Sequence, residues 1–167
     1  MKRPRRGEDS DRMLERDVIE VMQRQLSESV PFSRMLGVEI TSARPGEVQA
    51  RLPEAPERHN HVGTVHAVAQ FGLGETTSGV LLVATFNDLQ AQGFVPVMAD
   101  VAIHYHRPAR GDLFGRATLA LEEQVRIRDE VQSTGRSRVT IPVTLTDAGG
   151  TPTTDFELAW VLLRPRE

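Results

Sequence analysis

The chain has 167 residues, a length that suits one domain better than two. It contains no cysteine, which excludes disulfides, thiolate metal sites and cysteine nucleophiles. The formal net charge is −3, but four of the 20 basic residues lie in the first six positions, so the remainder carries 16 basic against 23 acidic side chains. This acidic excess argues against a nucleic-acid surface, and we expect no nucleic-acid partner.

The first ten residues are basic, and no long apolar stretch follows them. A secretory signal needs such a stretch, and the longest purely apolar run of the chain, residues 80–84, is far too short to span a membrane. We therefore expect residues 1–10 to be a disordered tail and residues 11–167 to form one domain. We expect a cytoplasmic location and no membrane partner.

The domain is expected to begin with a helix over residues 11–29, which Asp9 or Ser10 can cap and Pro31 ends. Its apolar residues recur at helical spacing: Leu14, Val18, Val21, Met22 and Leu26. From Val38 the apolar period changes to two. This predicts two short strands over residues 38–40 and 48–52, joined by a turn at residues 44–46.

A long, nearly uncharged stretch from His66 to about Phe86 predicts a buried helix. It is rich in glycine and alanine, so its intrinsic helix propensity is poor and packing must hold it together. Its small residues allow a sheet to approach the helix backbone closely.

Four further strands are predicted over about residues 95–105, 113–121, 139–145 and 156–162, and a short charged helix over residues 122–134. Pro142 interrupts one of these strands, which a bulge or an unpaired N–H position can accommodate. The fold class is therefore α+β: a long central helix wrapped by a curved antiparallel sheet, with an extra N-terminal helix.

The segment over residues 60–75 carries the chemistry. It enters the central helix through a glycine turn at Gly63, with Thr64 as a candidate N-cap. The free N–H groups at a helix start suit an oxyanion, such as the one formed when a thioester carbonyl is attacked. Glu75, the only charged side chain between His66 and Phe86, is either a solvent-facing or interface glutamate or a general base or nucleophile.

Geometry ties the enzyme interpretation to a dimer. Nine residues separate His66 from Glu75, which is about 13 Å along one helix. One carbonyl group cannot touch both ends of that span. If both residues act on one substrate, the carboxylate must come from another subunit.

The order and spacing of Asn60, His66 and Glu75 resemble the motif of hotdog acyl-CoA thioesterases of the phenylacetate-pathway (PaaI-like) type, near a branch of unassigned function. Residues 103–112, with Arg-Pro-Ala and a Gly-Asp turn, look like a second segment of that family. The resemblance implies a hotdog fold, an acyl-CoA substrate, a homodimer or homotetramer, and no metal or redox cofactor. It also implies that Glu75 activates water or attacks the thioester, and that Asn60 helps to place the water or the carbonyl.

The resemblance further implies that the backbone N–H of Ala67 or Val68, beside His66, polarises the carbonyl. Here the chain departs from the family, which has two glycines at these positions, and the added side chains can crowd the thioester. The alternative is therefore a non-catalytic hotdog module that binds an acyl-CoA or fatty-acyl ligand. Hydration of an enoyl thioester is a weaker option because the Asp-x-Asn-x-x-His arrangement is missing.

The histidines are weaker candidates for a site. His59, His61 and His66 lie close in sequence, and His104 and His106 share one face of a strand. No carboxylate completes a ligand set at convincing spacing, so we expect no metal site.

Overall fold

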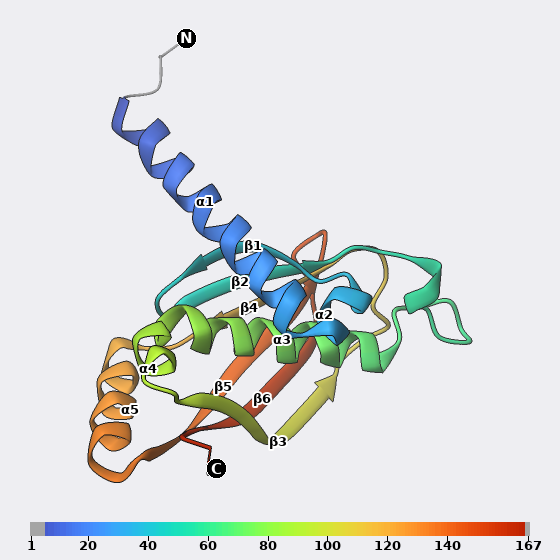
Figure 1. The fold of residues 1–167 in the computed structure, drawn as a ribbon. Helices are drawn as coiled ribbons and strands as arrows, with labels where there is room; N and C mark the ends of the chain where they lie inside the picture. Colours follow the sequence, from blue (N-terminus) through green and yellow to red (C-terminus); the bar gives the residue numbers. More distant parts are fainter. Residues whose placement is uncertain (1–5, 166–167) are drawn as a thin grey trace.

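A six-stranded antiparallel sheet curves around one long helix in the computed structural model, which describes residues 6–165, and their side chains from Asp17 onward (Figure 1). The sheet order is β1 (Glu39–Arg44), β2 (Glu47–Leu52), β4 (Leu113–Thr118), β5 (Arg136–Asp147), β6 (Pro152–Leu163) and β3 (Val95–Tyr105). The helices are α1 (Arg6–Ser29), α2 (Pro31–Leu36), α3 (Ala67–Thr85), α4 (Asn87–Ala91) and α5 (Leu121–Thr134), with a 3₁₀ turn, η1, at Pro56–Arg58. This is the hotdog fold that the sequence predicted.

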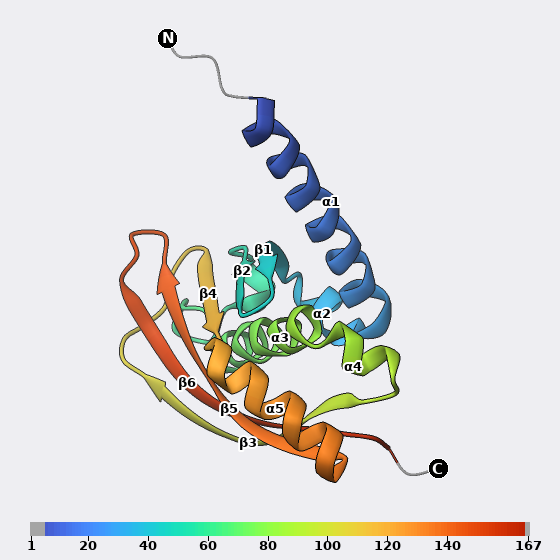
Figure 2. The same ribbon diagram turned by 90° about the vertical axis from the view of Figure 1, so that its left-hand side faces the viewer.

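The sheet wraps α3 closely (Figure 2), because a glycine on one side of the contact faces a larger side chain on the other. A Cβ atom added at Gly74 of α3 would lie 3.0 Å from the ring of Phe156 in β6. One added at Gly115 of β4 would lie 2.7 Å from Oγ1 of Thr77 in α3. The poor helix propensity of α3 is therefore offset by close packing on a buried core.

By length and composition α3 could also cross a membrane, and it is the only such helix among the described residues. However, 61% of that stretch is buried inside the fold. Its position under the sheet identifies it as the core helix of the domain.

Irregularities in the strand pairing account for the curvature. The register shifts at Ile40/Ser42 in β1, at Met98/Asp100 in β3 and at Leu145/Thr146 in β5, and such bulges bend and twist a strand.

Pro142 needs no bulge. It lies one residue beyond the last β4–β5 pair, Val143↔Ala117, so the ladder with β4 does not require its N–H.

Helices α1 and α2 cover the side of α3 that the sheet leaves open (Figure 2), while the N-terminal half of α1 projects away from the body (Figure 1). Gln23 fixes α1 to the first strand. Its side chain donates to the carbonyl of Val38 at 3.1 Å and accepts from the N–H of Ile40 at 2.7 Å. Apolar contacts of α1 come from Ile19, Met22 and Leu26, which pack against the core.

Several predicted boundaries are corrected. Helix α1 already begins at Arg6, so the predicted tail over residues 1–10 is wrong for residues 6–10, and Asp9 and Ser10 do not cap it. Residues 1–5 lie outside the described part of the chain. The predicted strand over residues 113–121 ends at Thr118, where α5 follows.

Two short helices were not predicted. Pro31 ends α1 but also begins α2, because proline suits the first turn of a helix. Gly37, at a φ of 76°, then caps α2. The second is α4, which follows Phe86 directly.

Candidate functional site

The start of α3 differs from the prediction in its cap. The N-cap is His66 and not Thr64, which lies two residues too early. The Nδ1 atom of His66 accepts a hydrogen bond from the backbone N–H of Val68 at 3.1 Å. Of the two N–H groups expected to face a carbonyl, that of Val68 is therefore already hydrogen-bonded. The N–H of Ala67 donates a hydrogen bond to no described residue.

The loop before α3 is shaped by Asn60. Its Oδ1 accepts from the N–H groups of Val62 and Thr64, both at 3.1 Å, and its Nδ2 donates to the hydroxyl of Thr64 at 2.8 Å. Gly63, at a φ of 72°, makes the turn in this loop and is exposed. The amide of Asn60 thus holds the loop in shape.

The two segments that resemble the thioesterase family meet at the start of α3, although about 45 residues separate them. The N–H of Val65 donates to the carbonyl of Ala109 at 2.9 Å, and Arg110 donates to the carbonyl of Gly63 at 3.1 Å. At the end of β3, the hydroxyl of Tyr105 donates to the carbonyl of Ala67 at 3.2 Å. The segment over residues 103–112 therefore braces the loop that leads into α3.

Asp112 anchors that brace to the sheet. Its carboxylate accepts from the N–H of Glu54 at 2.8 Å and from the guanidinium of Arg51 at 2.6 Å. These two contacts, the N–H of Glu54 first, lower the pKa of Asp112. This aspartate therefore stays ionised and serves as a structural anchor.

Glu75 lies two turns into α3 and is partly buried. Burial raises the pKa of its carboxyl group, and the neighbouring Thr76 hydroxyl opposes part of that rise. The Thr76 hydroxyl is in turn hydrogen-bonded to that of buried Ser33 in α2, at 2.9 Å. Glu75 is therefore the ionisable group in this region whose environment favours its neutral form.

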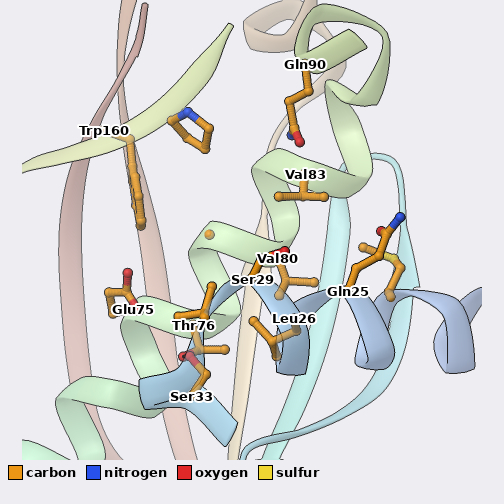
Figure 3. A pocket seen from close by; sticks show the side chains of 14 residues that line it. Gln25, Leu26, Ser29, Ser33, Glu75, Thr76, Val80, Val83, Gln90 and Trp160 are labelled. Carbon is orange, nitrogen blue, oxygen red and sulfur yellow. The ribbon is translucent and has the colours of Figure 1, made fainter. Parts of the chain in front are cut away.

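Trp160 of β6 lies beside Glu75 and is held in a fixed orientation (Figure 3). Its indole Nε1 donates to the hydroxyl of Ser78 at 3.0 Å, and that hydroxyl donates to the carbonyl of Glu75 at 2.9 Å. Ser78 is thus a packing residue, because its hydroxyl already has a partner on each side.

A cavity of about 450 Å³ opens beside Glu75. Figure 3 shows Glu75, Thr76 and Ser33 at one end of the view and Val83 and Gln90 at the other. The lining comes from α1, α2, α3, α4, β3 and β6 and consists of Met22, Gln25, Leu26, Ser29, Val30, Ser33, Glu75, Thr76, Gly79, Val80, Val83, Gln90, Pro96 and Trp160.

One chain does not bring all the predicted site residues together. Asn60, Gly63, His66, Ala67 and Val68 gather at the start of α3, whereas Glu75 lies further along the helix, about 13 Å from His66 at the rise of an α-helix. Val68 is 56% exposed. In a single chain its side chain is therefore largely exposed to solvent.

The residues that line the cavity beside Glu75 were not predicted from the sequence. Met22 and Leu26 were recognised only as part of an apolar helix face, and nothing in the sequence linked them to Glu75. Trp160 and Gln90 come from distant elements and carry no motif. Only the fold brings them to one cavity.

No metal site is formed by the described residues, where no three histidine, aspartate or glutamate side chains gather as candidate ligands. His106 instead contacts Asp155 at 2.7 Å on the exposed side of the sheet. Asp155 also accepts from the hydroxyl of Thr144, and these two contacts lower the pKa of its carboxyl group.

Solved structures similar to this chain share its fold. One is PA5026 from Pseudomonas aeruginosa, described as a protein of unknown function and probable thioesterase. It has 26% identity and a TM-score of 0.78, over 86% of this chain and 94% of that one. Another is a mutant of the thioesterase PA1618 from Pseudomonas aeruginosa, with 16% identity and a TM-score of 0.69, over 87% of this chain and 93% of that one.

A protein of unknown function from Chlorobaculum tepidum also matches, with 15% identity and a TM-score of 0.77, over 89% of this chain and 95% of that one. No curated protein matches the sequence. A family model does match, over residues 19–162, with the description "Domain of unknown function (DUF4442)". The chain therefore belongs to the DUF4442 family, and the predicted kinship with hotdog-fold thioesterases is confirmed.

Proposed function

We propose that this protein hydrolyses an acyl thioester of the kind carried by coenzyme A, with Glu75 as general base or nucleophile. One observation carries the proposal: among the described residues, Glu75 is the only ionisable side chain that lines a cavity of about 450 Å³, and burial raises its pKa. A carboxylate of raised pKa is a stronger base, which suits it to removing a proton from water. The likeness to PA5026, described as a probable thioesterase, supports the same reaction class.

The reaction in its general-base form needs no group beyond water. The Glu75 carboxylate takes a proton from water while the water oxygen attacks the carbonyl carbon, and the C=O electron pair moves onto oxygen. The pair returns, the C–S bond breaks, and the thiolate leaves and takes the proton back from Glu75. The products are a carboxylic acid and a thiol. As a nucleophile, Glu75 would instead form an anhydride that water then hydrolyses.

The oxyanion needs a hydrogen-bond donor. The start of α3 in the same chain lies about 13 Å from Glu75, so it cannot supply this donor. We therefore assign that donor to the start of α3 in a second copy of the chain, with the N–H of Ala67 as the donor. His66 already uses the N–H of Val68, so it acts as a cap that orders the helix start. Asn60 and Gly63 act as positioning residues by shaping the loop before it.

The edge of the sheet supports a dimer. Strand β3 pairs only with β6, so its other edge has no strand beside it in the described chain. Met98, Val101 and Ile103 of β3 pack against the core but stay only partly buried. Two copies joined along β3 would cover these side chains and bring the two α3 helices together.

The test is a hydrolysis screen with acyl-CoA thioesters of short, long and aromatic acyl groups. A thiol-reactive dye follows the released CoA without background from the protein, because the chain has no cysteine. We expect turnover by the wild-type protein and none by Glu75→Gln, which preserves the shape of the side chain but cannot accept the proton. Unchanged turnover in a folded Glu75→Gln protein would remove Glu75 from the mechanism.

A second candidate function is favoured by one observation. The N–H of Val68 is already bonded to His66, which leaves fewer free donors at the helix start than an oxyanion hole with two N–H groups needs. A non-catalytic module that binds acyl-CoA would not need them. Tight binding of a non-hydrolysable alkyl-CoA thioether, with no hydrolysis of any acyl-CoA, would favour this function over the first.

A further inference from the structure

Resting on the proposed hydrolysis at Glu75, we infer that the cavity beneath α1 holds the acyl chain of the substrate and selects an uncharged, unbranched chain of medium length. The cavity has Glu75 at one end, apolar walls along its middle, the carboxamide of Gln90 at its other end and that of Gln25 at its side. Its volume of about 450 Å³ lies within the range of small-molecule pockets.

The charge of the cavity selects against acyl groups that carry a second carboxylate. Of the residues whose side chains the structure describes, Glu75 is the only ionisable one in the lining, and none of the described arginines or histidines lines the cavity to pair with an anionic chain end. A buried, unpaired charge is costly, and a second carboxylate near Glu75 would add like-charge repulsion. The pocket therefore suits a monocarboxylic acyl group.

The shape of the cavity suits a slender chain. Along α3 the lining residues are Glu75, Thr76, Gly79, Val80 and Val83, which lie on one face of the helix. A Cβ atom added at Gly79 would lie 3.4 Å from the ring of Trp160, in ordinary van der Waals contact. The missing side chain at this position keeps the passage open between α3 and Trp160.

The length of the chain follows from where the apolar walls end. From Glu75 to Val83 the helix advances about 12 Å, at about 1.5 Å per residue. With C–C bonds of about 1.5 Å, an extended alkyl chain advances about 1.25 Å per carbon, so roughly 8–10 carbons fill this span.

Beyond Val83 the lining ends at Gln90, while Gln25 lines the side of the cavity (Figure 3). The side chains of Gln25 and Gln90 make no hydrogen bond to any described residue, and covering them with methylene groups would remove their water. A longer chain would therefore gain little from passing this point. The carboxamide of Gln90 sets the far limit of the pocket.

Helix α1 forms one wall of this pocket, and Gln23 holds it there. Met22, Gln25 and Leu26 face the cavity, while Gln23 bonds to the backbone of the first strand at Val38 and Ile40. The pocket thus depends on a segment outside the sheet and α3.

The test compares the wild-type protein with Val83→Phe and Gly79→Ala on butyryl-, octanoyl-, decanoyl-, palmitoyl- and adipoyl-CoA. The wild-type protein should prefer octanoyl- and decanoyl-CoA and reject adipoyl-CoA. Val83→Phe should lower kcat/KM for decanoyl-CoA by about tenfold and leave butyryl-CoA within about twofold. Gly79→Ala should lower kcat/KM for octanoyl- and decanoyl-CoA more than for butyryl-CoA. Its added methyl group fits beside Trp160 without a clash.

Val125→Phe is the matched control. Val125 is 50% exposed on α5 and does not line the cavity, so this change should leave the preference of the wild-type protein intact. Equal losses for butyryl- and decanoyl-CoA in Val83→Phe, or a wild-type preference for adipoyl-CoA, would overturn the inference.

Binding of non-hydrolysable butyl-, octyl- and decyl-CoA thioethers, measured by calorimetry, separates this inference from the proposed function. If the thioethers bind with the predicted length preference and Val83→Phe abolishes it, while no acyl-CoA is hydrolysed, the pocket stands and the hydrolase proposal fails. If acyl-CoAs are hydrolysed but neither variant changes the length preference, the hydrolase proposal stands and the pocket is wrong.

Discussion

Glu75 illustrates how a side chain that we propose as catalytic can lower the stability of the fold. Burial raises its pKa in the folded protein above the value of an unfolded chain. Such a group binds its proton more tightly when folded, so its contribution to stability is present below the unfolded pKa and is lost as the pH rises through the folded pKa. At neutral pH the ionised Glu75 therefore destabilises the fold.

We predict that Glu75→Gln raises the melting temperature at pH 7 and that this gain disappears at a pH below about 4.5, near the ordinary pKa of glutamate. Thermal unfolding of both proteins across this pH range measures it. Glu20→Gln, at an exposed position of α1, is the control and should show no such gain. A Glu75→Gln protein that is less stable than wild type at pH 7 would contradict the prediction.

The structure gives His66 the role of a helix cap. Its imidazole caps α3 by accepting from the N–H of Val68. We predict that His66→Ala lowers the free energy of unfolding by about 1 kcal/mol, as loss of an N-cap typically does. His66→Asn should recover most of this loss, because asparagine is a good N-cap.

Urea unfolding of the two variants measures this difference. If both variants lose the same stability, the hydrogen bond to Val68 is not what His66 contributes. If neither loses any, the cap has no energetic importance.

At the scale of elements, the glycines of α3 have opposite roles. Gly74 lies against the buried ring of Phe156, where an added Cβ would be 3.0 Å from the ring, whereas Gly79 has room for one beside Trp160. In a helix, alanine is favoured over glycine by about 0.5–1 kcal/mol. We predict that Gly79→Ala gains about this much stability and that Gly74→Ala loses stability, because the core must shift to admit the methyl group.

Calorimetric melting of the pair measures this prediction. Both variants make the same chemical change in the same helix, so each serves as the control for the other. A gain in both would mean that the sheet yields easily around α3, and that close packing does not explain Gly74.

The elements were largely predictable from the sequence, because apolar periodicity reports burial. The six strands and the long apolar helix were predicted correctly in order. Helices α2 and α4 were missed because helices of five or six residues have too few residues to show a period. The cap of α3 was misplaced because tertiary contacts of Val65, with Ala109 and with His59, hold this residue outside the helix.

The candidate site was predictable only where it is local. Asn60, His66 and Glu75 stand within 16 consecutive residues, so a motif could reveal them. The cavity beside Glu75 is built from six separate elements, and its lining is recognisable only after α1 has packed against β1 and α2. The role of the Asn60 amide was also hidden, because its bonds to Val62 and Thr64 depend on the shape of the loop.

At the scale of the whole molecule, we expect assembly to use the edge of β3 that pairs with no strand of the described chain. An exposed strand edge offers free N–H and C=O groups to another chain, and the partly buried Met98, Val101 and Ile103 would gain cover from it. A symmetric pair of such edges forms a closed dimer. A stable interface of this kind buries about 800 Å² on each partner.

We predict that the wild-type protein is a dimer or a larger even assembly at micromolar concentration and that Val101→Asp shifts it to a folded monomer. Val101 lies near the middle of β3 and is only partly buried within one chain. In a monomer the new carboxylate can therefore stay near water. In a dimer it would be buried without a cation to pair with it, which is costly. Because the proposed site needs Glu75 of one copy and the helix start of the other, the monomer should also lose hydrolysis. Light scattering measures the mass, circular dichroism the fold, and Val125→Asp, an exposed position on α5, provides the control. A wild-type protein that is a folded, active monomer would overturn the shared site and require the oxyanion donor to lie within one chain.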